Sequence, residues 1–392
     1  MKLQSVLVFL LTLALILNLG KVNLTLKNPS QLVYKPVYAA NNILPVGRVI
    51  ETKGEVFIKR RNWSDYHQVF VGTELYADDQ IKSISSSELT AICYANWETW
   101  NAPTDKISQP TEGCLQAKTE CVETPDGCVS PDATRSNNQI FISDKIPYVI
   151  SPRHTLLLNN QSIVLRWNPV TGVSRYTVVL KSPSESIWET EVSSNQVVYE
   201  GNISLKPGVR YVVIVHGDNN VSSLDEESPF SQQDPLGIGF SILEPSTEQN
   251  ITAQTEKLAQ KLKGEAQTLA LVEFYQKQKL NYEAINQLES LLKPNQKKPA
   301  IYYKLGEIYQ EIQLPFLAKD NYLKALEFIP EEDLSGIAEV QTALGEIYLT
   351  LNEKKEAINW LMLAYNQYKE LGEQPRQTEI KQLVEKINQS PP

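Results

Sequence analysis

The amino-acid sequence predicts a multidomain protein in which two all-β regions precede an all-α region. Residues 43–100 and 148–245 alternate apolar and polar side chains, the period-two pattern of half-buried strands. Residues 252–390 are rich in Ala, Leu, Glu, Lys and Gln, and their apolar positions follow a helical period. Strand blocks followed by a helical block indicate separate domains rather than one interleaved sheet.

The composition excludes several functional classes. The net charge is −9, and no basic stripe is present that would bind nucleic acid. The chain has three histidines and contains no G-x-S-x-G, H-E-x-x-H or G-x-x-x-x-G-K-[ST] motif. We therefore expect neither an enzyme nor a cofactor, and the sequence presents no candidate catalytic residue.

Residues 1–40 have the pattern of a targeting segment. An apolar run, Val6–Leu19, follows Lys2 and is about 14 residues long, shorter than the roughly 20 residues that span a membrane. This length favours a signal peptide, and the best cleavage site ends at Ala39. The alternative is a retained anchor, which would bring the protein to the membrane. Either interpretation exports the bulk of the chain to the periplasm or cell envelope.

The first β region, residues 43–100, carries a glycine-punctuated pattern. Gly47 and Gly54 lie in VGRVIETKGEVFIK, and the next stretch, VGTELYADDQIKS, contains G-x-x-L-x-x-x-D-x-I. This pattern resembles the FecR-like domain of bacterial envelope proteins over roughly residues 44–100. The sequence departs from that pattern at Asp78, where the family usually has glycine. The resemblance implies a small β domain in the envelope and allows a sensory or regulatory role.

Four cysteines lie in and around a loop-rich region at residues 101–147: Cys93, Cys114, Cys121 and Cys128. An even number of cysteines in an exported chain favours disulfides. Zinc sites usually contain a tight cysteine pair, whereas the last three cysteines here are spaced by seven, so a metal site is disfavoured. Three pairings are open. We prefer Cys93 with Cys114 and Cys121 with Cys128, because a Pro-Asp-Gly turn lies between the latter two.

The second β region, residues 148–245, contains two informative stretches, SIVLRWNPVTGVSRYTVVL and LKPGVRYVVIV. Ile163, Leu165 and Trp167 alternate onto one face. With the L-x-P-G-x-x-Y turn, they resemble a fibronectin type III or immunoglobulin-like sandwich. That resemblance implies that Trp167 and Tyr211 are core residues. The alternative is an exposed aromatic platform, which would suit a protein that binds cell-wall polysaccharide.

The helical region contains the five letters LGEIY twice, at residues 305–309 and 344–348. Small and aromatic residues recur at the same offsets after each copy, at Tyr309, Ala318 and Ala325 and again at Tyr348, Ala357 and Ala364. An upstream Tyr275 precedes Tyr309 by 34 residues. This spacing resembles the tetratricopeptide repeat. We expect repeats at roughly 265–298, 299–332 and 338–371, followed by a capping helix.

The two LGEIY copies are separated by 39 residues, five more than the repeat period. The extra residues lie in PEEDLSGIAEV, and five residues correspond to about 1.4 helical turns. We expect a first helix of the third repeat that is lengthened at its N-terminus, with Asp333 or Ser335 as the cap. A longer loop between repeats is the alternative.

The repeat resemblance implies a concave groove lined by the first helix of each repeat. The residues predicted to line it are Glu273, Tyr303, Glu307, Gln310, Glu311, Glu339, Thr342, Glu346 and Thr350. A ladder of glutamates favours a basic or amine-rich protein partner, although glutamate is also an ordinary residue on solvated helices. We therefore expect a non-enzymatic envelope adaptor or scaffold that binds a protein partner, with a FecR-like regulator and a polysaccharide-binding protein as alternatives.

Overall fold

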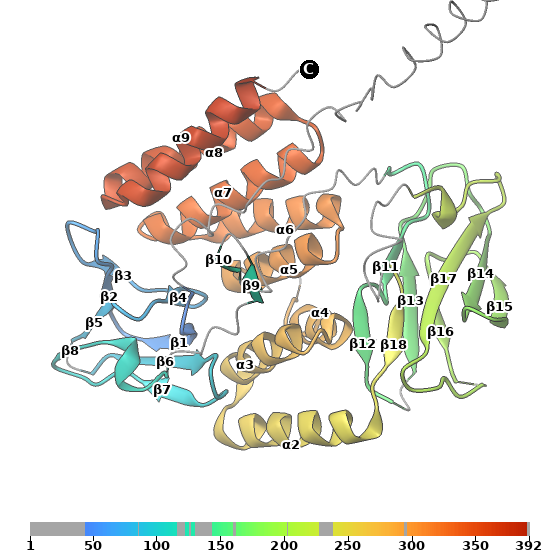
Figure 1. Ribbon diagram of the computed structural model, residues 1–392, viewed down its shortest axis with the longest axis horizontal. Coiled ribbons are helices and arrows are strands. Elements are labelled where there is room, and N and C mark those ends of the chain that lie inside the picture. The colour runs from blue at the N-terminus through green and yellow to red at the C-terminus, as the bar shows by residue number, and fades with distance from the viewer. Residues whose placement is uncertain are drawn as a thin grey trace, which may run out of the picture. The chain divides into compact units, whose positions relative to one another are not determined.

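The computed structural model contains a β-rich N-terminal part followed by a helical C-terminal part (Figure 1), which confirms the predicted order. The structure describes residues 44–84, 86–115, 122–124, 127–129, 143–159, 162–201, 203–226, 238–293 and 296–389. All of these residues belong to one compact unit, Lys35–Pro392. The predicted targeting segment, residues 1–40, lies outside the described residues.

The first β region consists of two four-stranded sheets, with strand orders β4-β1-β6-β7 and β3-β2-β5-β8. The strands are β1 Gly47–Lys53, β2 Val56–Lys59, β3 His67–Gln68, β4 Glu74–Leu75, β5 Gln80–Ser83, β6 Glu88–Cys93, β7 Thr99–Asn101 and β8 Ile107–Ser108. Alternation is visible in β5, where Ile81 is buried between exposed Gln80 and Lys82. Gly54 joins β1 to β2 with φ +69°, a backbone conformation that glycine adopts without steric cost.

A disulfide joins Cys93, at the end of β6, to Cys114, just after a short 3-10 helix, η2 Pro110–Glu112. This is the pairing that we preferred for these two cysteines from the sequence. Two further strands, β9 Val122–Thr124 and β10 Gly127–Val129, pair in antiparallel fashion. Cys121 and the side chain of Cys128 lie outside the described residues, so their pairing stays a prediction.

The second β region is a sandwich of a three-stranded sheet, β11-β13-β16, and a five-stranded sheet, β12-β18-β17-β14-β15. The strands are β11 Val149–Ser151, β12 Thr155–Leu157, β13 Ile163–Trp167, β14 Tyr176–Lys181, β15 Ser186–Val192, β16 Gln196–Tyr199, β17 Arg210–Gly217 and β18 Phe240–Ile242, and η4 Ser223–Asp225 is a 3-10 helix. The prediction that Trp167 and Tyr211 are core residues is confirmed, because both are buried. The Tyr211 hydroxyl also accepts a hydrogen bond from the Lys206 N–H at 2.7 Å.

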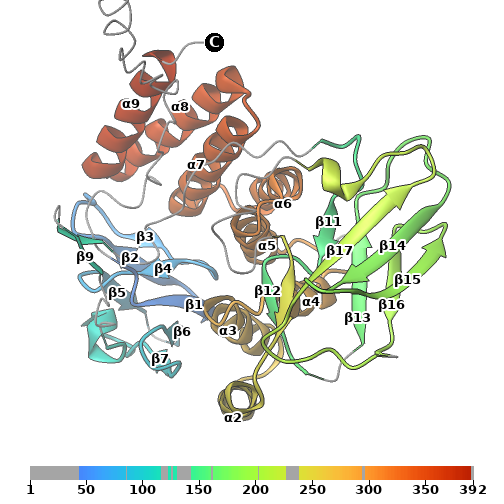
Figure 2. The same ribbon diagram turned by 45° about the vertical axis from the view of Figure 1, so that its right-hand side comes forward.

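The helices follow one another in a stack from α3 to α9 (Figures 1 and 2). They are α2 Pro245–Lys261, α3 Gly264–Lys277, α4 Asn281–Ser290, α5 Pro299–Glu311, α6 Pro315–Phe328, α7 Leu334–Thr350, α8 Lys354–Leu371 and α9 Gln374–Gln389. The pairs α3–α4, α5–α6 and α7–α8 give the region a tetratricopeptide-like architecture. Helix α2 begins at Pro245, before the predicted helical block. None of the described helices is both long and apolar enough to cross a membrane.

The glycines of the two LGEIY copies lie where paired helices touch. A Cβ atom on Gly306 would lie 2.5 Å from the Tyr322 ring, and one on Gly345 would lie 2.6 Å from Leu361 Cγ. Any side chain at either position would overlap its neighbour, so the repeated Leu-Gly pattern reflects close helix packing.

The extra residues between the second and third pairs lengthen α7. This helix has 17 residues, compared with 13 in α5. Asp333 is the N-cap, and its Oδ1 atom accepts a hydrogen bond from the Gly336 N–H at 2.9 Å. The prediction of a longer third-repeat helix is therefore confirmed.

Candidate functional site

The first β region packs against the face of the solenoid that the sequence predicts to be an open groove. The nine predicted groove residues do lie on the first helices of the three pairs, with Glu273 on α3, Tyr303, Glu307, Gln310 and Glu311 on α5, and Glu339, Thr342, Glu346 and Thr350 on α7. Strand β1 contacts α3 directly. The groove is therefore not open at these contacts, because a part of the same chain occupies the place at which a separate protein was expected.

Arg48 is the central residue of this contact. It projects from β1, and its Nη2 atom lies 3.1 Å from Glu307 Oε1 and 2.9 Å from Glu74 Oε1. Its Nε atom lies 3.3 Å from Glu273 Oε1. The side chain of Arg48 is only 7% exposed. One buried guanidinium thus joins the first β region to two helices of the solenoid.

Lys304 supplies a second cation to the same carboxylates. Its Nζ atom lies 2.8 Å from Glu273 Oε1 and 3.2 Å from Glu307 Oε2. Burial alone would raise the pKa of Glu307, but attraction to Arg48 and Lys304 outweighs it and lowers this pKa to about 2. Burial likewise opposes the charge of Arg48, yet Glu307 and Glu273 raise its pKa well above the usual value. Arg48 and Glu307 are therefore both ionised at neutral pH.

Tyr94 completes the cluster from the end of β6. Its hydroxyl accepts a hydrogen bond from Arg48 Nε at 3.2 Å and donates one to Glu273 Oε2, also at 3.2 Å. The Arg48 guanidinium lies 6.0 Å from the centre of the Tyr303 ring. A buried charge is costly unless its remaining hydrogen-bonding groups are satisfied. Tyr94 contributes to satisfying them here.

A second arginine, Arg60, joins the first β region to α7. Its Nη1 atom lies 3.6 Å from Glu339 Oε1. The guanidinium also lies 5.1 Å from the centre of the Trp63 ring and 4.9 Å from that of Tyr76. Burial raises the pKa of Glu339, and attraction to Arg60 opposes this shift. Arg60 therefore favours the charged form of this carboxylate.

The Arg60 contact continues to the end of the solenoid. Trp63 Nε1 donates a hydrogen bond to Glu373, which lies in the turn between α8 and α9. Gly372, with φ +79°, lies close to the Asn62 and Trp63 backbone, and a Cβ atom there would be 3.2 Å from Asn62 O. The first β region therefore contacts the solenoid from α3 to the α8–α9 turn.

Several other predicted groove residues bond within the solenoid itself. Gln310 Nε2 donates to Glu346 Oε2 at 3.2 Å. Glu311 Oε1 lies 2.8 Å from Lys279 Nζ. The hydroxyls of Thr342 and Thr350 donate to the carbonyls four residues earlier in α7, at 2.8 and 3.1 Å. These contacts order the solenoid.

The sandwich is also attached to the solenoid, through the α3–α4 turn. The Leu156 N–H donates to Lys279 O at 2.8 Å, and the Tyr282 N–H donates to Thr155 Oγ1 at 3.1 Å. The Val164 N–H donates to the Tyr282 hydroxyl at 3.0 Å. These three hydrogen bonds, each donated by a backbone N–H, give the sandwich a defined orientation on the helices.

Two arginines extend this second contact. Arg166 Nη1 lies 2.8 Å from Glu289 Oε2 on α4. Arg153 is fully buried, donates from Nε to Ile312 O at 2.8 Å, and pairs with Glu226. The sequence contained no direct signal for these arginines or for Arg48, Arg60 and Lys304, because lysine and arginine side chains are usually solvated.

Comparisons with known proteins add little to this geometry. No family model matches the chain, and no curated protein matches it. Among solved structures, one described as "Crystal structure of MamA" is 18% identical, with 37% of this chain and 91% of that chain covered and a TM-score of 0.26. Another, "Crystal structure of MamA protein", is 19% identical and also has a TM-score of 0.26. That match covers 37% of this chain and 81% of the other chain.

Proposed function

We propose that this protein is a non-enzymatic scaffold of the bacterial cell envelope that binds a protein partner. Its tetratricopeptide-like solenoid holds two β regions in a defined arrangement, and the partner binds to the assembled surface. The observation that carries this proposal is Arg48, which lies between Glu273 and Glu307. The acidic groove has the basic occupant that its charge favours, and that occupant is the chain's own first β region.

We assign the two β regions to the families that their motifs resemble. The first is a FecR-like module, and its two small sheets are compatible with that assignment. The second is a fibronectin type III or related sandwich. Support comes from its division into three- and five-stranded sheets and from the Tyr211 hydroxyl, which bonds back to Lys206 in the manner of a tyrosine corner.

Export to the envelope is part of the proposal. The apolar run Val6–Leu19 supports it. The Cys93–Cys114 disulfide supports it as well, because structural disulfides are typical of exported proteins and rare in reducing compartments. Peptide sequencing of the mature N-terminus in a soluble envelope fraction would separate a cleaved signal from a retained anchor.

The polysaccharide-binding alternative has little support. It requires exposed aromatic side chains, yet Trp167 and Tyr211 are buried. Trp188 is partly buried, and its ring lies 5.5 Å from that of Tyr199. We therefore favour protein binding over carbohydrate binding.

Affinity capture from the native envelope fraction tests the scaffold, with the full-length protein as bait. The variant Arg48→Ala/Arg60→Ala removes the arginines of the first β region that pair with Glu273, Glu307 and Glu339 of the solenoid. We expect it to lose the partner, because the assembled surface comes apart. Arg61→Ala is the matched control, because it removes an arginine of the same β region whose side chain is 80% exposed. The Nη1 atom of Arg61 lies 3.9 Å from Oδ2 of Asp78, which also belongs to the first β region.

Two outcomes would contradict this proposal. If the double variant captured more partner than the wild type, the first β region would be blocking a groove that the partner uses. If its capture were unchanged, the arrangement of the β regions would be irrelevant to binding. Circular dichroism of the double variant separates loss of the contact from loss of folding.

A further inference from the structure

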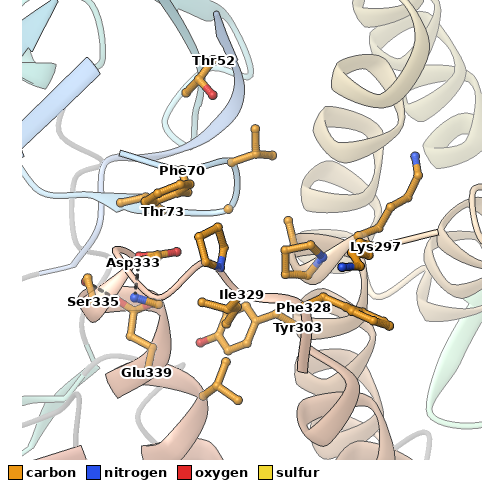
Figure 3. A pocket seen from close by; sticks show the side chains of 18 of the residues that line it. Thr52, Phe70, Thr73, Lys297, Tyr303, Phe328, Ile329, Asp333, Ser335 and Glu339 are labelled. Carbon is orange, nitrogen blue, oxygen red and sulfur yellow. Dashed lines mark hydrogen bonds between the residues drawn. The ribbon is translucent and has the colours of Figure 1, made fainter. Parts of the chain in front are cut away.

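A cavity remains between the first β region and the solenoid, beside the Arg48 and Arg60 contacts. Its volume is about 430 Å³, within the range of small-ligand sites. The β-region wall includes Phe70 and Thr73, and the solenoid walls come from the segment before α5, the end of α6 and the start of α7. Figure 3 shows these walls facing one another across the cavity.

Three aromatic side chains contribute to this lining. Phe70, Tyr303 and Phe328 all line the cavity, and each is partly buried. Phe70 comes from the first β region, whereas Tyr303 and Phe328 come from α5 and α6. An apolar or aromatic body therefore fits between the two parts of the molecule.

The polar side of the cavity is acidic. Asp333, Ser335 and Glu339 lie together at the start of α7, and the side chain of Lys297 extends away from Asp333 (Figure 3). The Glu339 carboxylate is paired with Arg60. A third acid in the lining, Glu265, is paired with Lys298. Two of the three carboxylates therefore already have a cation.

Asp333 differs from these two acids. Its Oδ1 atom accepts the capping hydrogen bond from Gly336. Among the residues that the structure describes, no cation lies within ion-pair distance of its carboxylate. Arg60 acts on Asp333 only from a greater distance. A partly desolvated carboxylate without a counter-ion is energetically costly and favours an incoming cation.

We propose that this cavity binds an organic cation, an ammonium or guanidinium group on an apolar stem, with the charge at Asp333 and the stem between Phe70, Tyr303 and Phe328. The same interface already uses this chemistry within the chain, since Arg48 lies beside Tyr303 and Arg60 lies over Trp63. A free amine and a basic side chain of a bound polypeptide share this chemistry. The site goes beyond the scaffold function and does not depend on it.

Binding of small probes to the purified full-length protein, followed by NMR-detected titration, tests the site. Benzylamine, benzyl alcohol and benzoate share one aromatic body and differ in charge. We expect benzylamine to bind about tenfold or more tightly than the other two, because only its ammonium pairs with Asp333. Acetyl-Gly-Arg-Gly amide, with acetyl-Gly-Gln-Gly amide as its neutral control, represents a basic side chain. If benzylamine binds more tightly than the arginine peptide, the natural ligand is a free amine. If the arginine peptide binds more tightly, the natural ligand is a basic side chain of a polypeptide.

Two variants locate the binding. Asp333→Asn removes the charge and keeps a good N-cap, so α7 stays intact and benzylamine binding weakens about tenfold. Phe70→Leu alters the wall from the first β region and weakens binding without touching α7. Asp320→Asn, at an exposed position on α6, is the matched control and leaves binding unchanged.

The pH dependence gives an independent readout. Burial raises the pKa of Asp333 to about 7, with Glu339 adding to the shift and Arg60 opposing it. Benzylamine binding should therefore strengthen between about pH 6 and pH 8 in the wild type and lose this dependence in Asp333→Asn. The charged groups that line the cavity are Asp333 at the N-cap of α7, Glu339 on α7, Glu265 on α3, and Lys297 and Lys298 before α5. Arg60 acts on them through its pair with Glu339.

Three results would overturn the proposal. The first is equal binding of benzylamine and benzyl alcohol. The second is benzylamine binding that survives both Asp333→Asn and Phe70→Leu. The third is the absence of binding by either cationic probe at millimolar concentration. None of these results bears on capture of a protein partner, so the cavity and the scaffold can fail separately.

Discussion

Arg48 Nη2 lies 3.1 Å from Glu307 Oε1, although 259 residues separate the two in sequence. This pair connects a strand of the first β region to a helix of the solenoid. Lys304 and Glu273 surround it, so cations and carboxylates alternate in a buried cluster. A glutamate that sequence alone assigns to partner binding is thereby committed to the internal assembly of the protein.

Loss of Arg48 should destabilise the protein substantially. Arg48→Ala leaves Glu273 and Glu307 with Lys304 as their remaining cation, and removal of one member of a buried ion pair typically costs about 3–5 kcal/mol. We expect the free energy of unfolding in urea to fall by about 3 kcal/mol. Arg61→Ala, at an exposed position, should change it by less than about 0.5 kcal/mol. Similar effects for the two variants would show that the buried cluster does not stabilise the contact.

The Cys93–Cys114 disulfide should stabilise the first β region. It closes a segment with a sequence separation of 21, and disulfides of this kind typically contribute about 2–4 kcal/mol. Cys93→Ser/Cys114→Ser should lower the free energy of unfolding by that amount. Non-reducing peptide mapping should recover the Cys93–Cys114 linkage and also tests the predicted Cys121–Cys128 pair. Recovery of Cys93 joined to any other cysteine would refute the assignment.

The repeat glycines should not tolerate a side chain. Gly306→Ala places a methyl group 2.5 Å from the Tyr322 ring, and overpacking of this kind costs about 1–3 kcal/mol. This cost outweighs the gain in helix propensity from alanine, which is about 1 kcal/mol. Thermal unfolding should therefore occur at a lower temperature. Lys324→Ala, on the exposed face of α6, is the control, and a Gly306→Ala variant as stable as this control would contradict the close helix crossing.

Asp333 should make stability depend on pH. Burial raises its pKa to about 7, compared with about 4 in an unfolded chain. Between these values the folded state binds more protons than the unfolded state, so the contribution of Asp333 to stability falls as the pH rises. Asp333→Asn removes this loss and should stabilise the protein more at pH 8 than at pH 5, by about 2 kcal/mol.

Unfolding in urea at both pH values, for the wild type and for Asp333→Asn, measures this difference. Comparison at the same pH cancels the contributions of other groups, including Glu307, whose lowered pKa has the opposite sign. Asp320→Asn should show no such pH dependence. An Asp333→Asn effect that is equal at the two pH values would mean that the carboxyl group titrates normally.

Much of the secondary structure could be predicted because local patterns carry it. The period-two alternation predicted strands such as β13 and β14, and the recurrence around Gly306 and Gly345 predicted the helix pairs. The five extra residues predicted a longer α7, with Asp333 as a candidate cap. Each of these features depends on residues close together in the sequence or on the period of a repeat. Both kinds of pattern can be recognised in a single sequence.

The candidate site was predicted only in part. The glutamates were correctly placed on the first helices, but their partners were missed. Arg48 and Arg60 lie more than 200 residues from the solenoid acids they meet, and the separation between Arg48 and Glu307 is 259 residues. No periodic pattern connects such distant positions. Alternating charge in each segment is equally compatible with two solvated surfaces.

By itself, the sequence determined the modules: two β regions, a cysteine-containing loop region between them, and paired helices whose small residues mark their crossings. Only the tertiary structure decided what the acidic groove holds, because ion pairing depends on distance and desolvation rather than on position along the chain. It also decided where a carboxylate stays without a cation, at Asp333, since the cavity exists only once two separately encoded surfaces come together.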